Sequence, residues 1–394
     1  MNKYFDQINA FIDAHHDEML EKWAALVNLE GHYSEKEKVE AARAWVKAEF
    51  EAEGFVCSVH EVAENRCGIL DGVLGAGRHG KPILFGGHID TVHMSGSFDG
   101  PNPFKIVDGK AYGPGVLDMK GGIVIALYVV KALNSIGYDE RPIRIIFAGE
   151  EESDHIGNNA DLYYQEHAKG AVCAFNMETG HIENCLCLGR KTQYTIRGKV
   201  HGLGGHAGNE FTKGKNALHE AMLKLTEIMK LTELDKGTTV TVSMLRAGCP
   251  ENQTSIPDLA EFIIDLRIFS ADLGKELLAK VEKLLNTTYI EGTTTEYTVD
   301  FAKLYAFFAN DRTYNFFNHL NSVAEENGFE QFGEIKLGGA SDAGSISMAG
   351  VPVICSAGVI GEYNHNRREY AVVQSLFDRA KIYATAITEM DKDF

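Results

Sequence analysis

The segment Pro82–His93, PILFGGHIDTVH, indicates the fold class of the first half of the chain. Its short apolar run ILF predicts a buried strand that ends at two glycines. His88 and Asp90 follow directly, with one residue between them. Taken by itself, this pair is either a polar turn or a metal ligand together with the carboxylate that orients it.

Two further segments follow the same plan. Residues 141–151 read RPIRIIFAGEE and residues 170–180 read GAVCAFNMETG, and each contains a short apolar run typical of a buried strand. Residues 118–138 have the length and periodicity of a helix that ends at Gly137. This alternation predicts an α/β domain with a mostly parallel sheet and helices on both faces.

The pattern changes near residue 190. The segments that follow predict the order strand, helix, two strands, helix, strand, at about residues 192–200, 215–231, 238–248, 260–269, 271–285 and 294–301. This is the order of a ferredoxin-like α+β sandwich. Its half-polar strands predict an antiparallel sheet with one open face.

The α/β pattern resumes after residue 304, with a helix expected near 312–327 and an apolar run at 351–358. The chain is therefore expected to form an α/β domain from residues 1–189 and 304–394. A ferredoxin-like domain at residues 190–303 is inserted into it.

Length and charge limit the class of protein. A chain of 394 residues is long enough for two or three domains. Its formal net charge is −18, from 56 acidic residues against 38 lysines and arginines. Partners with negatively charged surfaces, such as nucleic acids and anionic membranes, attract basic proteins, so neither is expected.

The cellular compartment and the redox state of the cysteines are inferred from the same features of the sequence. No run of about 18 apolar residues is present, and the first twenty residues lack the apolar segment of a signal peptide. A cytoplasmic protein with seven reduced cysteines is expected. Cys185 and Cys187 either bind zinc or alternate along a strand, and without a second cysteine pair the strand is favoured.

Side chains able to bind metal follow several of the predicted strands. They are His88, Asp118, Glu150, Glu151, Glu152, Glu178 and His365. Ligands bind at the carboxyl ends of the strands in open α/β sheets. Two histidines with at least three carboxylates suit two divalent ions, most readily zinc, with cobalt or manganese as alternatives.

A pair of ions needs a bridging carboxylate, and it can activate a water molecule whose proton another carboxylate accepts. The triplet Glu150–Glu152 offers a ligand and a base side by side. Its alternative interpretation is a solvated run of charge, but adjacent acids directly after the apolar IIFAG repel one another unless cations neutralise them. In this arrangement Asp90 accepts the second N–H of the His88 imidazole.

Five segments in order resemble one known family: GGHIDTV, GPGVLDMKGG, FAGEEES, FNMETG and GEYNHNRREY. The family is that of the dinuclear zinc peptidases and deacylases. It includes glutamate carboxypeptidase, acetylornithine deacetylase and succinyl-diaminopimelate desuccinylase. The resemblance covers nearly the whole chain.

The resemblance implies a role for each residue of the site. Asp118 would bridge two metal ions, with Glu152 and His365 completing one site and His88 and Glu178 the other. Glu151 would be the general base and Asp90 the orienting carboxylate. A cis peptide bond between Asp118 and Met119 is also implied.

The inserted domain carries further family features. The segment GLGGHAGNEFTKGKNAL contains His206, which the resemblance places at a homodimer interface, reaching into the partner's active site to stabilise the tetrahedral intermediate. Arg267 and the glycine-rich turn at Gly339 would bind the carboxylate of the substrate, and Asn252 would contact the substrate. The insert is thus expected to serve as a dimerisation or lid domain.

The chain departs from the family pattern at three places. The usual acidic triplet is Asp-Glu-Glu, so Glu150–Glu152 leaves a one-residue ambiguity over the base, which spacing to Asp118 resolves in favour of Glu151. Strict spacing places Thr254 where the family has asparagine, although Asn252 is near. Cys185 stands where glutamate-specific members carry lysine, which argues against specificity for a glutamate side chain.

Four classes of function remain to be weighed. The expected activity is hydrolysis of an amide bond next to a free carboxylate, by a carboxypeptidase or an N-acyl-amino-acid deacylase acting on peptides or N-acyl amino acids. Glu178 supports it, because family members that act on dipeptides tend to carry aspartate there; a metallo-dipeptidase is the alternative. A binding protein without chemistry would lack a ligand or the base, and a dinuclear phosphoesterase would have no use for His206 and Arg267.

Overall fold

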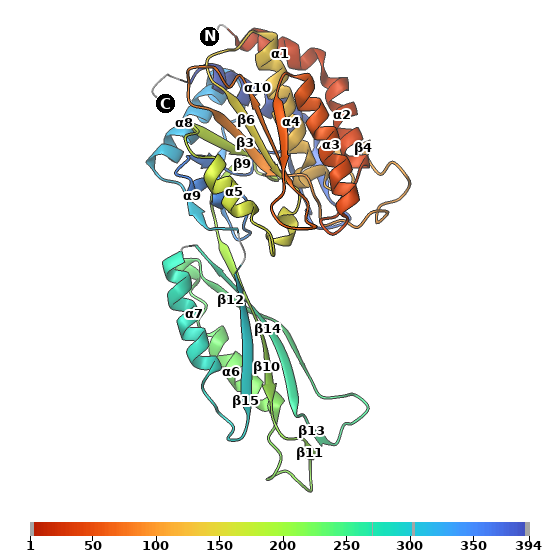
Figure 1. The fold of residues 1–394 in the computed structure, drawn as a ribbon, viewed down its shortest axis with the longest axis vertical. Coiled ribbons are helices and arrows are strands. Elements are labelled where there is room, and N and C mark those ends of the chain that lie inside the picture. The colour runs from red at the N-terminus through yellow and green to blue at the C-terminus, as the bar shows by residue number, and fades with distance from the viewer. Residues whose placement is uncertain (1–3, 270, 302–303, 391–394) are drawn as a thin grey trace. The chain divides into compact units, whose positions relative to one another are not determined.

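The computed structural model describes residues 4–269, 271–301 and 304–390, in two compact units (Figure 1). The major unit contains the described residues through Gly189, then Phe307–Leu337 and those from Ser341 onward. The insert unit contains the described residues of Arg190–Ala306 together with Gly338–Ala340. The expected domain limits at residues 1, 303 and 394 lie outside the described residues.

A six-stranded sheet forms the centre of the major unit. Its order is β1 (Val56–His60), β2 (Ile69–Leu74), β6 (Ile143–Ala148), β3 (Ile83–His88), β7 (Cys173–Asn176) and β18 (Val353–Ile354). β6, β3, β7 and β18 are parallel to one another, whereas β1 and β2 form an antiparallel edge. The predicted α/β class with a mainly parallel sheet is confirmed.

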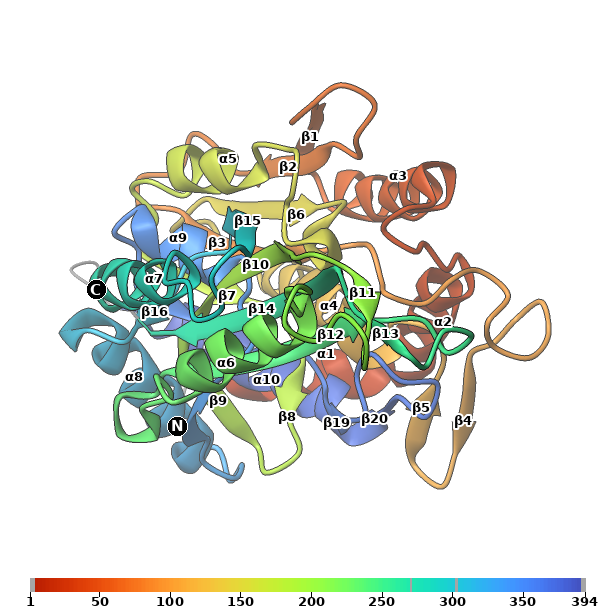
Figure 2. The ribbon, with the colours of Figure 1, turned by 90° about the horizontal axis from the view of Figure 1, so that it is seen from below.

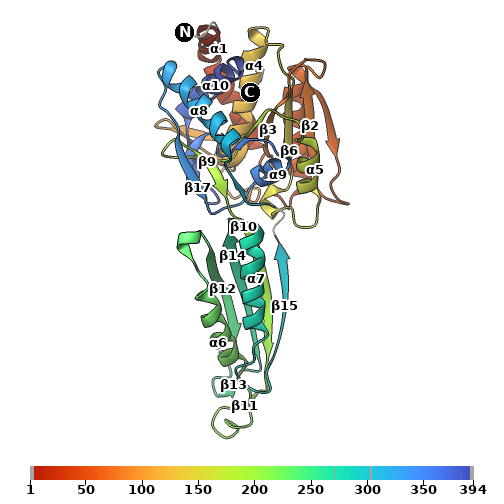
Figure 3. The same ribbon diagram turned by 90° about the vertical axis from the view of Figure 1, so that its left-hand side faces the viewer.

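Helices cover both faces of this sheet, as Figure 3 shows. Every residue of β3 is buried, which explains why its sequence is a continuous apolar run rather than an alternation. Ile83 and Phe85 belong to one hydrophobic cluster and Leu84 to the other, because successive side chains point to opposite faces.

The larger cluster lies under six helices, which are α1 (Phe5–Ala14), α2 (His16–Asn28), α3 (Lys36–Ala52), α4 (Gly121–Ser135), α8 (Asp311–Glu326) and α10 (Val373–Thr388). The smaller cluster lies under α5 (Ala160–His167) and α9 (Ala343–Met348).

Two smaller sheets complete the major unit. One has the order β4 (Lys105–Val107), β5 (Lys110–Tyr112), β20 (Tyr370–Val372), β19 (Ile360–Glu362) and β8 (Gly180–His181). The other has the order β16 (Phe307–Phe308), β9 (Cys185–Arg190) and β17 (Gly333–Leu337). Cys185 and Cys187 therefore both lie on β9, as the alternating pattern predicts.

The insert unit has the predicted ferredoxin-like fold. Its elements are β10 (Thr192–His201), α6 (Ala217–Met229), β12 (Thr239–Ala247), β14 (Leu259–Ile268), α7 (Ala271–Leu285) and β15 (Thr294–Phe301). The strands form one antiparallel sheet in the order β12, β14, β10, β15. Figure 2 shows both helices on one side of these strands, where they close a separate hydrophobic cluster.

A short ribbon extends from one end of the insert sheet, where β11 (Gly205–His206) pairs with β13 (Ser255–Ile256). In the described part of the chain, no helix combines the length and the apolar character needed to cross a bilayer.

Candidate metal centre

The major unit brings most of the sequence-predicted site residues together beyond the carboxyl ends of its parallel strands. His88 is the last residue of β3, and Glu178 follows two residues after β7. Glu151 and Glu152 begin the short helix η2 (Glu151–Ser153) after β6. Asp118 lies in the irregular turn η1 (Val116–Lys120) before α4, and His365 lies in the loop between β19 and β20.

His88, Asp118 and Glu178 form the first ligand group, in which one atom from each residue lies within 4.8 Å of the others. Nε2 of His88 is 3.2 Å from Oδ1 of Asp118 and 3.4 Å from Oε1 of Glu178. All three side chains are buried.

Asp118, Glu152 and His365 form the second group, again within 4.8 Å of one another. Nε2 of His365 is 3.3 Å from Oδ2 of Asp118 and 3.1 Å from Oε2 of Glu152. The two oxygens of Asp118 thus face different histidines, and Asp118 is the member that both groups share. A carboxylate placed in this way can bridge two cations.

The backbone around Asp118 is held by a residue that the sequence did not single out. Oε1 of Glu369 accepts hydrogen bonds from the backbone N–H groups of Leu117, at 2.8 Å, and of Asp118, at 3.0 Å. Its other oxygen is 2.6 Å from Nε2 of His93, and both side chains are buried. The peptide bond between Asp118 and Met119 is cis, as predicted. Glu369 follows His365 by four residues in the polar segment NHNRREY, whose sequence gives no sign that Glu369 is buried.

The three glutamates of the triplet have different surroundings. Glu150 points away from both ligand groups: Oε1 accepts the backbone N–H of Cys67 at 2.8 Å, and Oε2 is 3.0 Å from Nε of Arg66. Oε2 of Glu151 is 4.0 Å from Nε2 of His88, next to the first group. Glu152 is a member of the second group, whereas Glu151 belongs to neither group.

Asp90 is fully buried beneath the site and holds the triplet by its backbone. Its two carboxylate oxygens accept the N–H groups of Glu151, at 3.2 Å, and Glu152, at 3.0 Å. Nδ1 of His88 lies 3.0 Å from the backbone oxygen of Asp90 and 3.4 Å from its Oδ1. The expected orienting contact is therefore shared between the carbonyl and the carboxylate of the same residue.

The charged side chains of the two ligand groups shift one another's pKa values. Burial acts to lower the pKa of His88, but the negative charges of Glu178 and Asp118 outweigh it and hold the pKa well above its usual range. Hydrogen bonds to Asp118 and Glu152 raise the pKa of His365 to about 11. Burial opposes the ionisation of Asp118, yet contacts with both imidazoles keep its pKa below the usual value.

The two neighbouring glutamates shift the other way. Burial, followed by the charge of Asp118, raises the pKa of Glu152 to about 8. Burial and the charge of Glu178 raise the pKa of Glu151 well above its usual value. In the protein without bound metal, both shifts oppose the build-up of negative charge at this site.

The side chains present fit two divalent cations. Oε1 of Glu152 is buried and has no hydrogen-bond partner among the described residues, which is costly unless a cation lies beside it. Four carboxylates, those of Asp118, Glu151, Glu152 and Glu178, carry together the charge that two divalent ions balance. Imidazole nitrogen and carboxylate oxygen are both ligands that zinc accepts.

The other sequence-predicted residues lie in the insert unit. His206 is exposed on β11, where its Nδ1 accepts the backbone N–H groups of Gly208 and Asn209 at 3.2 Å each. A ring nitrogen that accepts two N–H bonds carries no proton, so the proton of the neutral ring is on Nε2. Asn252 is exposed in the loop before β13, and its carbonyl accepts the Ser255 hydroxyl at 3.0 Å.

Arg267 lies on β14 opposite Gln193, and its Nε donates to Asp265 at 3.0 Å. Gly339 groups with the insert unit, and its carbonyl accepts a hydrogen bond from Arg190 at 3.4 Å.

His206 and Arg267 of one chain lie at opposite ends of the insert sheet. The β11–β13 ribbon adjoins the Leu259 end of β14, and Arg267 is near the other end of that strand. Eight residues of extended chain span about 26 Å, at about 3.3 Å per residue. A single small substrate cannot contact both side chains of the same insert unit.

The chain is similar to known proteins over most of its length. The sequence profile of Peptidase family M20/M25/M40 matches residues 84–389. The chain is 28% identical over 370 residues to carboxypeptidase G2 of Pseudomonas sp. (strain RS-16), covering 93% of this chain and 87% of that protein. It is 27% identical over 333 residues to succinyl-diaminopimelate desuccinylase of Methylorubrum populi, covering 79% and 83%.

A solved tripeptidase structure from Staphylococcus aureus superposes with a TM-score of 0.80 at 21% identity, covering 94% of this chain and 97% of the other. At this level of identity the likeness shows a shared fold.

Proposed function

The chain belongs to Peptidase family M20/M25/M40, and we propose that it is a two-metal hydrolase that cleaves an amide bond next to a free carboxylate. The observation that carries this proposal is the pair of ligand groups that share Asp118, with Glu151 beside them and outside both. The substrate is an N-acyl amino acid or the C-terminal end of a peptide.

Two zinc ions, with cobalt or manganese as alternatives, would act as Lewis acids that polarise the scissile carbonyl and lower the pKa of a water molecule. His88 and Glu178 would hold one ion, Glu152 and His365 the other, and Asp118 both. Asp90 keeps the ligand Glu152 and the base Glu151 in fixed positions by binding both of their backbone N–H groups.

Glu151 would accept the proton of the attacking water and pass it to the leaving amine. Its position supports this role, because the side chain is buried near His88 and belongs to neither ligand group. Burial and the charge of Glu178 raise the pKa of Glu151 in the metal-free protein, and cations that balance the charge of Glu178 would lower it again.

Substrate binding would rest on the insert unit. Arg267, oriented by Asp265, would pair with the free carboxylate, and the turn at Gly339 would contribute backbone groups. The Nε2–H group of His206 would donate a hydrogen bond to the oxyanion that forms at the scissile carbonyl. Asn252 lies near the same end of the insert as His206, since Ala207 bonds to the carbonyl of Thr254, and would contact the substrate from there.

We infer that the protein acts as a homodimer in which His206 serves the active site of the partner chain. The separation of His206 from Arg267 supports this, because both must reach one substrate. β12 is an edge strand of the insert sheet, and the neighbouring α6 exposes Met222, Leu223 and Met229. A sheet edge beside exposed apolar side chains is suited to pairing with a second copy.

The test is a hydrolysis screen with zinc- or cobalt-loaded protein. The panel contains N-acyl amino acids, peptides with free C-termini and unblocked dipeptides, with released amine as the measurement. Turnover of substrates that combine an acylated nitrogen with a free carboxylate is expected.

Two results would change the proposal. Cleavage of unblocked dipeptides alone would replace it with a metallo-dipeptidase. Absence of turnover on the whole panel by protein that contains two ions per chain would contradict it.

A further inference from the structure

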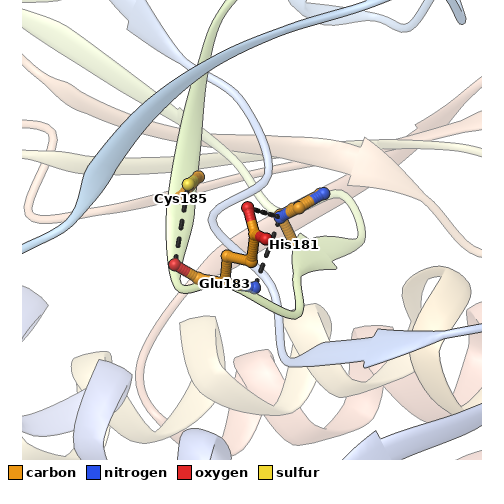
Figure 4. A group of neighbouring side chains, drawn as sticks. All are labelled: His181, Glu183 and Cys185. Atoms are coloured by element: carbon orange, nitrogen blue, oxygen red, sulfur yellow. Dashed lines mark hydrogen bonds and ion pairs between the residues drawn. The ribbon is translucent and has the colours of Figure 1, made fainter.

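A second set of metal-competent side chains lies in the major unit, on the turn between β8 and β9, apart from the residues of the dinuclear centre. His181, Glu183 and Cys185 each offer one ligand atom, and the three atoms lie within 4.8 Å of one another (Figure 4). Nδ1 of His181 is 3.9 Å from Oε2 of Glu183. The thiol of Cys185 points to the same turn, with Sγ 3.6 Å from the carbonyl oxygen of Glu183.

Hydrogen bonds from neighbouring elements fix the backbone of the turn that carries these residues. Asn184 has a positive φ of 52°, and its N–H donates to the carbonyl of His181 at 2.9 Å. Its side-chain oxygen accepts a bond from the buried Arg379 at 3.4 Å, and its carbonyl accepts the N–H of Gly333 at 3.2 Å. The three side chains therefore start from a backbone that α10 and β17 keep in place.

The position of the thiol has its own constraint. Cys185 and Cys187 are two residues apart on β9 and so lie on the same face of the strand. Cys187 is buried, whereas Cys185, at the first position of the strand, is partly accessible. Sγ of Cys185 lies against the backbone of Gly333, where a Cβ atom would come within 2.7 Å of the sulfur. A glycine at this position leaves room for the thiol beside the turn.

We propose that His181, Glu183 and Cys185 form a third metal site, for a divalent cation of borderline softness such as zinc or cobalt. One imidazole, one carboxylate and one thiolate make three ligands, and the exposure of Glu183, at 78%, leaves the remaining position open to water. The site differs from the dinuclear centre in its chemistry, because none of the residues assigned to that centre is a cysteine.

A cation bound there would join two sheets. His181 ends β8 in the five-stranded sheet, and Cys185 begins β9 in the three-stranded sheet. The bound ion would add a link between them and stabilise the folded protein in proportion to its affinity. Binding must displace the thiol proton, since burial and the charge of Glu183 raise the pKa of Cys185, while Arg379 acts to lower it.

The test uses the absorption of cobalt. The full chain is stripped of metal under reducing conditions and titrated with Co²⁺, and metal content is measured after removal of excess ion. A near-ultraviolet charge-transfer band reports a cobalt–thiolate bond, which the dinuclear centre cannot give. We expect this band together with three ions per chain.

Two substitutions and one control decide the assignment. Cys185→Ser should abolish the band and reduce the content by one ion. Cys249→Ser is the matched control, because Cys249 is exposed beside Glu251 and should leave the band unchanged. Glu183→Gln keeps the thiol and alters only an exposed side chain, so it should weaken binding of the third ion at least about tenfold without changing the fold.

The proposal is overturned if the native chain shows no charge-transfer band, or if the band survives Cys185→Ser. The circular dichroism spectrum of each variant establishes that it is folded, and the Glu183→Gln result stands even if Cys185→Ser does not fold.

Discussion

Nε2 of His155 lies 2.7 Å from Oδ1 of Asp342, and both side chains are completely buried. His155 follows the acidic triplet by three residues, and Asp342 precedes α9. Asp90 holds the start of the triplet by two backbone N–H groups, so the segment with Glu151 and Glu152 is fastened at both ends. The His155–Asp342 pair is thus placed to determine where the proposed base can lie.

Removal of His155 should impair both turnover and stability. His155→Ala leaves Asp342 as an unpaired buried charge, which typically costs about 3–5 kcal/mol of unfolding free energy. We expect kcat to fall at least about tenfold with little change in KM, since the base is displaced but carboxylate recognition is not. Denaturant unfolding and steady-state kinetics measure the two effects, and a KM change without a kcat change would contradict this role.

The same pair should make stability depend on pH. Burial acts to lower the pKa of His155, but Asp342 raises it above the usual 6.5. A raised folded-state pKa means that the stabilisation is fully present below pH 6.5 and is lost as the pH rises through the folded-state pKa. The difference in unfolding free energy between native protein and His155→Gln should therefore be largest at low pH, and a difference that grows with pH would refute the assignment.

Glu151 and Glu150 provide a matched test of the base. Glu151→Gln should reduce kcat by roughly 10²–10⁴-fold, the usual contribution of a general base, with two ions still bound. Glu150→Gln changes the adjacent acid, whose contacts are with Arg66 and Cys67, and should retain most of the turnover of the folded enzyme. The opposite ranking of the two variants would move the base by one residue.

Metal binding should release protons. The pKa of His365 is raised to about 11 and that of His88 lies well above its usual range, so both imidazoles are protonated in the metal-free protein at neutral pH. Both must be neutral to bind a cation, so affinity should increase with pH. Calorimetric titration in two buffers of different ionisation enthalpy counts the protons, and zero net release at pH 7 would contradict the assigned ligands.

Mixed dimers test the shared active site. Arg267→Ala and His206→Ala should each be inactive as homodimers. Dissociated and reassembled together, they should recover roughly a quarter of native activity, because half of the dimers are mixed and one site in each has both residues. If both residues served the site of their own chain, the mixture would stay inactive.

Features of the fold and site that depend on residues close together in the sequence could be predicted, and features that depend on residues far apart could not. The strands could be predicted because their apolar runs and alternations are local, and the ligands stood out because an acid or imidazole follows several of these runs. His88 ends β3 and Glu178 follows β7, so the rule that ligands bind at the carboxyl ends of parallel strands is enough to expect these two together. The fold class was predictable for the same reason.

Features that rest on tertiary contacts were missed. His93 contacts Glu369, which lies 276 residues away in the sequence, and His155 contacts Asp342, which lies 187 residues away. Nothing local distinguishes these buried pairs from surface residues. The separate role of Glu150 likewise depends on Arg66 and Cys67, whose position beside the triplet the sequence does not reveal.

The surroundings of Asp90 have a consequence for which residues that position can accept. Its two oxygens receive the N–H groups of Glu151 and Glu152, and Nδ1 of His88 lies 3.4 Å from one of them. Each of these neighbours offers a hydrogen, so this position suits a side chain whose two terminal atoms both accept hydrogen bonds. Asparagine has the same outline, yet one of its two ends would present a hydrogen to another hydrogen. Asparagine is thus the replacement nearest in shape to Asp90, but it puts a hydrogen-bond donor where the surrounding groups require an acceptor.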